Sequence, residues 1–183
     1  MKVFVLCFMV ACSGYSHAQQ ICHSQLTKNT PDARYQANGS EIKDNQTNLI
    51  WQRCALGQTW SGTTCTGLEK TYTWENALQA AKQTGWRLPN IKELKSLVET
   101  ACYDPAINSN MFKEVSSNSY WTSSTLAEDA RNAWTVKFDD GIVLLAQYPR
   151  KIVTIFATLN SSMPLHAKHD VKKTQTVLLH PNA

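Results

Sequence analysis

The sequence predicts an α+β fold, in which two helices pack on an antiparallel β-sheet. Two neighbouring segments, 73–85 and 90–101, repeat their apolar residues with the period of a helix. From residue 119 onward the pattern changes to the alternation that is typical of strands. A doubly wound or barrel fold would alternate strands and helices along the whole chain, so this segregated order argues against both.

The first predicted helix lies in "TYTWENALQAAKQTG". Thr73 is a good N-cap residue. Apolar residues then recur at helical spacing from Trp74 to Ala81, which indicates one buried face. Gly85 is placed to end the helix in a left-handed turn.

The second predicted helix lies in "PNIKELKSLVETAC". Asn90 caps it, and Glu93 follows three residues later, as in a capping box. We expect its apolar face to be buried through Ile91, Leu94, Leu97, Val98 and Ala101. We expect its charged side chains to face water, namely Lys92, Glu93, Lys95 and Glu99.

Strands are predicted on both sides of the helices. Before them, residues 34–36 and 49–52 have the pattern of short strands, and Asn38-Gly39 and Asp44-Asn45 are predicted turns. After them, 119–125 is a predicted strand, and 132–147 is a predicted hairpin around the Asp140-Gly141 pair. The stretch "KIVTIFATL", 151–159, is the candidate last strand.

The length fits one domain with an extension at each end. Residues 1–18 have the features of a signal peptide, with a charged Lys2, a short apolar run and a small-x-small site that ends at Ala18. A lipidated Cys12 is the alternative for this leader. We expect a polar lead-in at 19–33, the domain at 34–159 and an atypical polar tail at 160–183.

Charge and hydropathy narrow the class of protein. The formal net charge is +4 at pH 7 and falls by one without Lys2, which is too weakly basic for a typical nucleic-acid binder. No apolar run reaches the roughly 20 residues that a transmembrane helix needs. We therefore expect an exported protein, periplasmic, secreted or at the cell surface, with no transmembrane segment and no nucleic-acid partner.

Four cysteines remain once the leader is removed, and in an exported chain an even number indicates disulfides. Cys54 and Cys65 flank a loop that could close on itself, which leaves Cys22 to pair with Cys102. The longer bridge would stabilise the fold by roughly 4 kcal/mol. Buried free thiols and a zinc site are the alternatives, and zinc is disfavoured because no Cys-x-x-Cys pair exists.

Seven segments occur in a consistent order: "DNQTNLIWQRC", "GQTWSGTTCTG", "YTWENALQAA", "WRLPNIKELKSLVE", "CYDPAIN", "YWTSS" and "AWTVKFDDG". Together they resemble the Lcl C-terminal domain family over residues 34–143. The resemblance implies a C-type-lectin-like fold, with two helices on antiparallel sheet and long loops on one side. It also implies an exported or surface-attached bacterial protein, because the family is named for a collagen-like adhesin associated with glycosaminoglycan binding.

The chain departs from the family in three respects. "KIVTIFATL" lacks the Tyr-Val-Arg type of closing strand. No Gly-X-Y repeat is present, so a trimer built on a collagen helix is not implied. The calcium-site tripeptides of sugar-binding C-type lectins are also missing, so a calcium-dependent sugar site is not implied.

The corner "GWRLPNIKEL", 85–94, places an aromatic ring beside a cation, Trp86 and Arg87. A ligand site is one interpretation. The tight corner favours a structural role, with Arg87 bonded to carbonyls or to a carboxylate such as Glu93 or Asp104.

The ligand-binding candidates come from the later strands and their loops, where lectin-like folds present ligands. They are Tyr120, Trp121, Arg131 and Lys137. Aromatic rings can stack on a sugar, and cations can meet a sulfate. Ordinary packing is the alternative for each of them.

No catalytic residue, metal site or cofactor is predicted. The histidines of the mature chain lie outside the motif-bearing region, namely His23, His166, His169 and His180. "HAKHD" has metal-like spacing only in a helix, and a turn alone explains Asp139 and Asp140. The leading hypothesis is a non-enzymatic binding or adhesion module for a polyanionic glycan or a cell-surface partner. The alternatives are a structural subunit of a surface appendage or envelope complex and, less favoured, a secreted enzyme.

Overall fold

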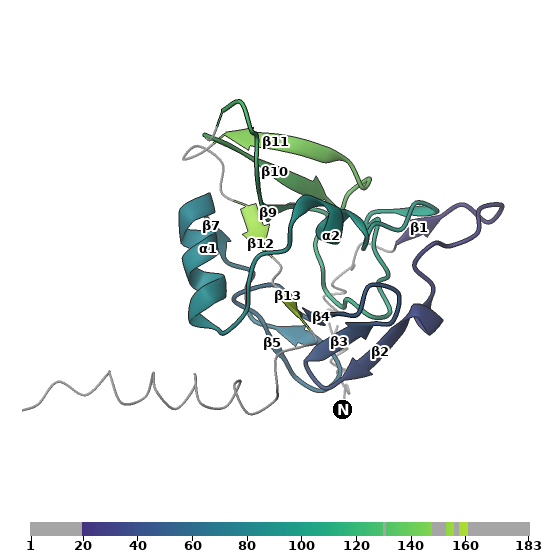
Figure 1. Ribbon diagram of the computed structural model, residues 1–183. Helices are drawn as coiled ribbons and strands as arrows, with labels where there is room; N and C mark the ends of the chain where they lie inside the picture. The colour runs from purple at the N-terminus through teal and green to yellow at the C-terminus, as the bar shows by residue number, and fades with distance from the viewer. Residues whose placement is uncertain (1–19, 130, 148–152, 156–157, 161–183) are drawn as a thin grey trace, which may run out of the picture.

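Helices α1 (Trp74–Gln83) and α2 (Ile91–Lys95) lie against one five-stranded sheet in the computed structural model of the protein (Figure 1). The structure describes residues 20–129, 131–147, 153–155 and 158–160. The expected signal peptide at 1–18 lies outside these residues, as does the tail beyond Asn160 with its "HAKHD" segment. The described part is a small mixed α/β domain, as the α+β prediction required.

Two larger sheets and two small ones carry the strands. In chain order the strands are β1 (Ile21–Cys22), β2 (Tyr35–Asn38), β3 (Glu41–Asp44), β4 (Leu49–Gln52), β5 (Thr59–Trp60), β6 (Cys65–Thr66), β7 (Thr71–Tyr72), β8 (Cys102–Tyr103), β9 (Ser119–Thr125), β10 (Asn132–Lys137), β11 (Val143–Gln147), β12 (Val153–Ile155) and β13 (Thr158–Asn160). A 3-10 turn, Asp32–Arg34, precedes β2. The larger sheets have the orders β11-β10-β9-β12-β7 and β13-β4-β3-β2, and the small ones are β1-β8 and β5-β6. All pairs are antiparallel except β12 with β9.

Helix α1 forms where its sequence pattern predicts it. The Thr73 hydroxyl accepts a hydrogen bond from Asn76 N–H at 3.4 Å, as an N-cap does. Ala77 and Ala81 are fully buried on its apolar face. Gly85 follows with φ of +76°, a left-handed conformation that ends the helix.

Helix α2 is shorter than its apolar pattern predicts. The expected capping box is present, since Glu93 N–H donates to Asn90 Oδ1 and Asn90 N–H donates to Glu93 Oε2. The helix nevertheless ends at Lys95. Val98 instead forms an antiparallel bridge with Ile107, so extended pairing replaces the last turns. The buried face is confirmed for Leu94, Leu97, Val98 and Ala101.

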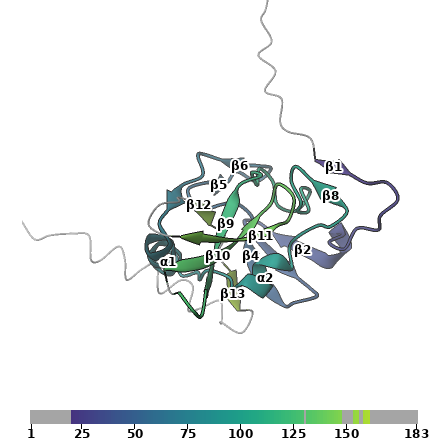
Figure 2. The same ribbon diagram turned by 90° about the horizontal axis from the view of Figure 1, so that it is seen from above.

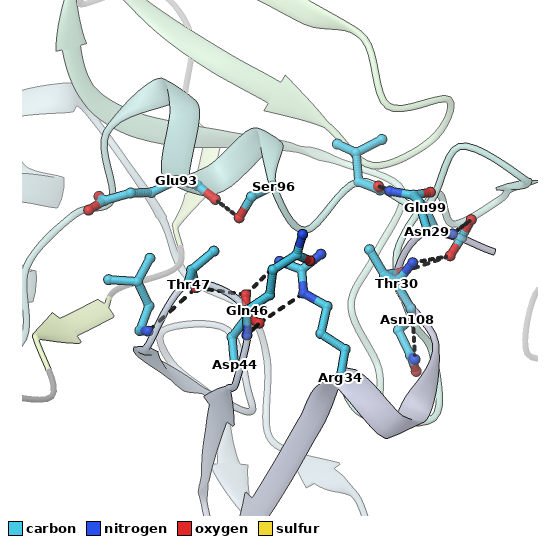
Figure 3. Close-up of polar contacts among 12 residues, drawn as sticks. Asn29, Thr30, Arg34, Asp44, Gln46, Thr47, Glu93, Ser96, Glu99 and Asn108 are labelled. Carbon is cyan, nitrogen blue, oxygen red and sulfur yellow. Dashed lines mark hydrogen bonds and ion pairs between the residues drawn. The ribbon is translucent and has the colours of Figure 1, made fainter.

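The expectation that Glu99 faces water is wrong. Its side chain is buried and accepts four hydrogen bonds: from Asn29 N–H at 3.2 Å, from Thr30 N–H and hydroxyl at 2.8 Å each, and from Ala101 N–H at 2.9 Å (Figure 3). Burial raises the pKa of Glu99, but these bonds outweigh it and hold the pKa below its ordinary value. Glu99 therefore fastens the segment before residue 31 to the domain as a buried anion.

The N-terminal segment is attached at further points. Strand β1 pairs with β8, and Gln20 Nε2 donates to the carbonyls of Pro105 and Ile107 at 2.8 and 2.6 Å. Asn108 Nδ2 donates to Thr30 O at 2.7 Å. The described residues of the expected lead-in, from Gln20 onward, thus pack on the domain through specific contacts.

The predicted last strand, "KIVTIFATL", contains two strands in two different sheets. Strand β12 lies between β9 and β7, and β13 pairs with β4. Because β12 pairs with β9, β9 is an interior strand of the five-stranded sheet, whereas β11 remains at the edge of that sheet.

The predicted hairpin is confirmed as β10 and β11, with a longer turn than expected. Lys137 N–H donates to Ile142 O at 2.9 Å, so the connection spans residues 138–141. Gly141 takes φ of +76° within it, and its N–H donates to Lys137 O.

The core has two parts. One joins the larger sheets beneath α2 and contains Trp51, Leu94, Tyr120 and Phe138. The other lies between α1 and the sheet and contains Ala77, Ala81, Leu88 and Trp121. No helix in the described part of the chain is long and apolar enough to cross a membrane.

Candidate functional site

The two aromatic candidates, Tyr120 and Trp121, belong to the core. Both rings are fully buried, since β9 is an interior strand covered on both faces. Tyr120 O–H donates to Glu69 Oε1 at 3.1 Å, and Trp121 Nε1–H donates to Tyr72 O at 3.0 Å. Burial, and then the Glu69 carboxylate, raise the pKa of Tyr120 well above its ordinary value. The expectation that these rings are exposed for a ligand is therefore wrong.

The two cationic candidates, Arg131 and Lys137, are each paired with a neighbouring carboxylate. Arg131 is 75% exposed and its Nε donates to Asp129 Oδ1 at 2.9 Å. Lys137 forms an ion pair with Asp139. Arg131 precedes β10 and Lys137 ends it, so roughly 20 Å of strand separates them. The structure does not bring the four candidates together into one site.

The corner at 85–94 is held by an ion pair. Arg87 donates two hydrogen bonds to the Glu93 carboxylate, Nη1 to Oε2 and Nη2 to Oε1, both at 2.8 Å. Its Nη1 also donates to Leu88 O at 3.2 Å. Burial raises the pKa of Glu93, but the bonds from Arg87 and from Asn90 N–H outweigh it and lower the pKa. This arrangement confirms the structural interpretation of Arg87, with Glu93 as its partner.

A second arginine, Arg34, is neutralised in the interior. Its Nε donates to Asp44 Oδ1 at 2.8 Å, and both side chains are almost fully buried (Figure 3). Asp44 also accepts from Gln46 N–H at 2.9 Å and from the Thr47 hydroxyl at 2.7 Å. This carboxylate has its acceptor sites occupied, so the pair serves the fold.

Both predicted disulfides form. Cys22 bonds to Cys102, where β1 meets β8, and Cys54 bonds to Cys65. The second bridge closes the segment 54–65, which we call the disulfide loop.

The disulfide loop brings a cation and an aromatic ring together. Trp60 lies opposite Cys65 in the β5-β6 pair, and Cys65 is bonded to Cys54, the neighbour of Arg53. The bridge therefore sets Arg53 beside Trp60. The guanidinium carbon lies 4.0 Å from the centroid of the Trp60 ring, which is a close cation–π contact.

Arg53 differs from the other three arginines that the structure describes. Its Nε donates to Met111 O at 3.1 Å and its Nη1 to Gly39 O at 3.3 Å. Within the described residues these carbonyls and the Trp60 ring are its partners, and no carboxylate pairs with it. Burial lowers the pKa of Arg53 from its ordinary value, but a guanidinium stays protonated at any physiological pH. Arg53 thus carries an unneutralised positive charge at the surface.

This arrangement can bind an anion next to a flat apolar surface. A guanidinium has five N–H donors, and the two carbonyls take two of them, so three remain for an incoming group. Sulfate and carboxylate groups accept paired bonds from such a fork. Sequence reasoning missed this pair. The predicted Cys54–Cys65 bridge places Arg53 near Cys65, but Trp60 reaches the same place through its pairing with Cys65 in β5 and β6, which the sequence pattern did not indicate.

The acidic residues of the β10-β11 connection serve the turn. Asp140 Oδ1 accepts from Ile142 N–H at 3.2 Å. The hydrogen bond between the side chains of Asp104 and Asp139 raises the pKa of Asp104, and Lys137 lowers the pKa of Asp139. Among the described residues, no group of three or more His, Cys, Asp or Glu side chains is placed to hold a metal ion.

The model of the Lcl C-terminal domain matches residues 40–154, more than half of the chain. The chain belongs to the Lcl C-terminal domain family. The matched part of this Lcl C-terminal domain contains Arg53, the disulfide loop and the corner at 85–94. No curated protein and no solved structure matches the chain.

Proposed function

We propose that this chain is an exported, non-enzymatic binding module of C-type-lectin-like fold that recognises a polyanionic glycan through Arg53 and Trp60. One observation carries the proposal: Arg53 has no carboxylate partner among the described residues, yet it is held in place by two carbonyls and a ring. A fixed guanidinium binds an anion with less loss of side-chain freedom than a mobile one.

The setting of the protein supports an extracellular ligand. Two disulfides suit an oxidising compartment, and residues 1–18 have the features of a signal peptide. The collagen-like adhesin that gives the family its name is associated with glycosaminoglycans. Such a glycan offers sulfates for Arg53 and sugar rings for Trp60.

Heparin chromatography with matched variants tests the proposal. Arg53→Ala should elute from heparin at lower salt than the wild type, because among the described arginines Arg53 is the one whose guanidinium is not paired with a carboxylate. Arg131→Ala removes the same formal charge from an exposed ion pair and should elute close to the wild type. On a plain sulfopropyl exchanger the two variants should shift equally. Equal shifts on heparin as well would overturn the assignment to Arg53.

A further inference from the structure

The turn between β2 and β3 contains the one Asn-Gly pair of the sequence. Asn38 ends β2 and pairs with Glu41, the first residue of β3, so Gly39 and Ser40 alone form the turn. Gly39 takes φ of +57°, and a Cβ at this position would meet nothing within 4 Å. Asn38 and Gly39 are both exposed. The backbone of Gly39 is therefore open to solvent and to the side chain of Asn38.

An asparagine followed by a glycine can lose its amide without an enzyme. The backbone nitrogen of the glycine gives up its proton and attacks the side-chain carbonyl carbon of the asparagine. A five-membered imide closes and ammonia leaves. Water then opens the imide at either of its two carbonyls, which leaves an aspartyl or an isoaspartyl residue. The reaction consumes one water and releases one ammonia, and glycine favours it because no Cβ obstructs the attacking nitrogen.

The fold holds neither of the two reacting groups. Within the described part of the chain, no hydrogen bond engages the Asn38 side-chain amide or the Gly39 N–H. Two other exposed asparagines differ: Asn118 Nδ2 donates to a serine hydroxyl at 2.9 Å, and the N–H that follows Asn45 donates to Asp44 Oδ1 at 2.9 Å. Asn38 also lies at the end of its strand pair, so opening of that one pair lets the two groups meet while the sheet stays folded.

The products alter two contacts of this turn. The aspartyl product places a carboxylate directly opposite Glu41, and like charges opposite each other destabilise a strand pair. The isoaspartyl product adds one carbon to the main chain between residues 38 and 39, which changes the length of a two-residue turn. Gly39 O is one of the two carbonyls that hold Arg53, since it accepts from Nη1 at 3.3 Å. Either product therefore disturbs the position of Arg53 and adds a negative charge close to it.

We propose that Asn38 is a site of spontaneous deamidation, and that its conversion loosens Arg53 and weakens anion binding there. The link to Arg53 rests on the function proposed above, whereas the chemical step does not. No step of the reaction restores the amide, so the converted fraction rises with the age of the protein. The anion site would then lose affinity with time after synthesis, without any change in the rest of the fold.

Peptide mapping of the full chain, stored in neutral and in mildly alkaline buffer, tests the chemical step. The peptide with Asn38 should show the mass of amide-to-acid conversion, take up oxygen from isotope-labelled water and become a substrate for isoaspartyl methyltransferase. Its rate should rise with pH, because the attacking nitrogen must lose its proton. Asn45 and Asn118 are controls within the same molecules and should convert far more slowly. Conversion of Asn38 no faster than that of these controls overturns the proposal.

Asn38→Gln separates the reaction from its consequence. Glutamine would have to close a larger ring, so this variant should keep both its amide and its elution from heparin during storage. Stored wild type should elute at lower salt than fresh wild type. Equal elution of the two, despite conversion at Asn38, overturns the link to Arg53. If fresh Arg53→Ala elutes with the wild type, the function proposed for Arg53 has failed and that link with it, while the peptide map still decides whether Asn38 deamidates.

Discussion

Two pairs of a tryptophan and an arginine illustrate how the same residue types serve different purposes. Trp86 and Arg87 lie in the corner that leads into α2, and Arg53 and Trp60 lie at the disulfide loop. Figure 2 shows α2 and the β5-β6 pair on opposite sides of the molecule. Arg87 is bound twice by Glu93, so its charge is neutralised within the fold. Arg53 rests on a ring and two carbonyls, and no carboxylate in the described part of the chain neutralises it.

The difference teaches that the role of an arginine depends on whether a carboxylate pairs with its guanidinium, and not on whether a tryptophan lies beside it in the sequence. On the α2 side, the carboxylates of Glu93 and Glu99 each accept several hydrogen bonds. The bonds to Glu99 also fasten the segment before residue 31 to the domain. The disulfide loop has few such contacts and relies on its covalent bridge. We therefore expect mutations on the α2 side to change stability and mutations at the disulfide loop to change binding.

The largest expected effect comes from removing each disulfide in turn. The bridge Cys22–Cys102 spans a sequence separation of 80 and Cys54–Cys65 one of 11, so the double serine variants should lose about 4 and about 3 kcal/mol of unfolding free energy. Denaturant unfolding measures both. The folded Cys54→Ser, Cys65→Ser variant should also lose heparin retention, because Arg53 and Trp60 are no longer held together. Retention that falls only in the Cys22, Cys102 variant would contradict the comparison.

The next largest effect is expected at Glu99. Glu99→Gln should lower the unfolding free energy at pH 7 by about 2 to 3 kcal/mol, because the amide presents a donor where the carboxylate accepts from N–H groups. Glu75→Gln, on the first turn of α1, is the control and should change it by less than about 0.5 kcal/mol. Similar losses of unfolding free energy in the two variants would show that the buried Glu99 carboxylate stabilises the fold no more than the exposed Glu75 does.

The same carboxylate predicts how stability depends on pH. The pKa of Glu99 is lower in the folded state than its ordinary value of 4.5. Its contribution is therefore complete above pH 4.5 and is lost as the pH falls through the lower folded value. Unfolding free energy measured from pH 7 downward should fall less steeply for Glu99→Gln than for the wild type. A steeper fall for the variant would contradict the sign of the shift.

Local patterns were enough to predict α1, the capping box and both disulfides, and they named Glu93 as one of two carboxylates that could bind Arg87. They failed where distant segments decide the environment. Glu99 has the spacing of a helix surface, but Val98 pairs with Ile107 and turns it inward. Tyr120 and Trp121 lie among serines and threonines that suggest a half-exposed strand. They are buried because Tyr120 packs into the core that joins the two larger sheets and Trp121 into the core beneath α1, and no local pattern encodes these distant contacts.

An intermediate effect is expected for Arg87→Ala. Its ion pair is 39% and 19% exposed, so losing it should cost about 1 to 2 kcal/mol of unfolding free energy. Elution from heparin should stay within the range of the Arg131→Ala control, because the charge of Arg87 is already neutralised. Thermal unfolding and heparin chromatography on one preparation give both readouts. Unchanged stability with lost retention would make the corner at 85–94 a binding site.

The smallest effect on stability, and the sharpest on binding, is expected for Arg53→Lys. A lysine keeps the positive charge but has no planar fork to lie on Trp60 or to offer paired N–H groups to a sulfate. Loss of the half-buried cation–π contact should cost about 1 kcal/mol of unfolding free energy. Elution from heparin should nevertheless fall toward that of Arg53→Ala, while elution from a sulfopropyl exchanger stays at the wild-type value. If Arg53→Lys matches the wild type on both columns, charge alone explains retention. Arg53 and Arg87 would then differ in binding only because one charge is neutralised and the other is not, and the geometry of the disulfide loop would play no part.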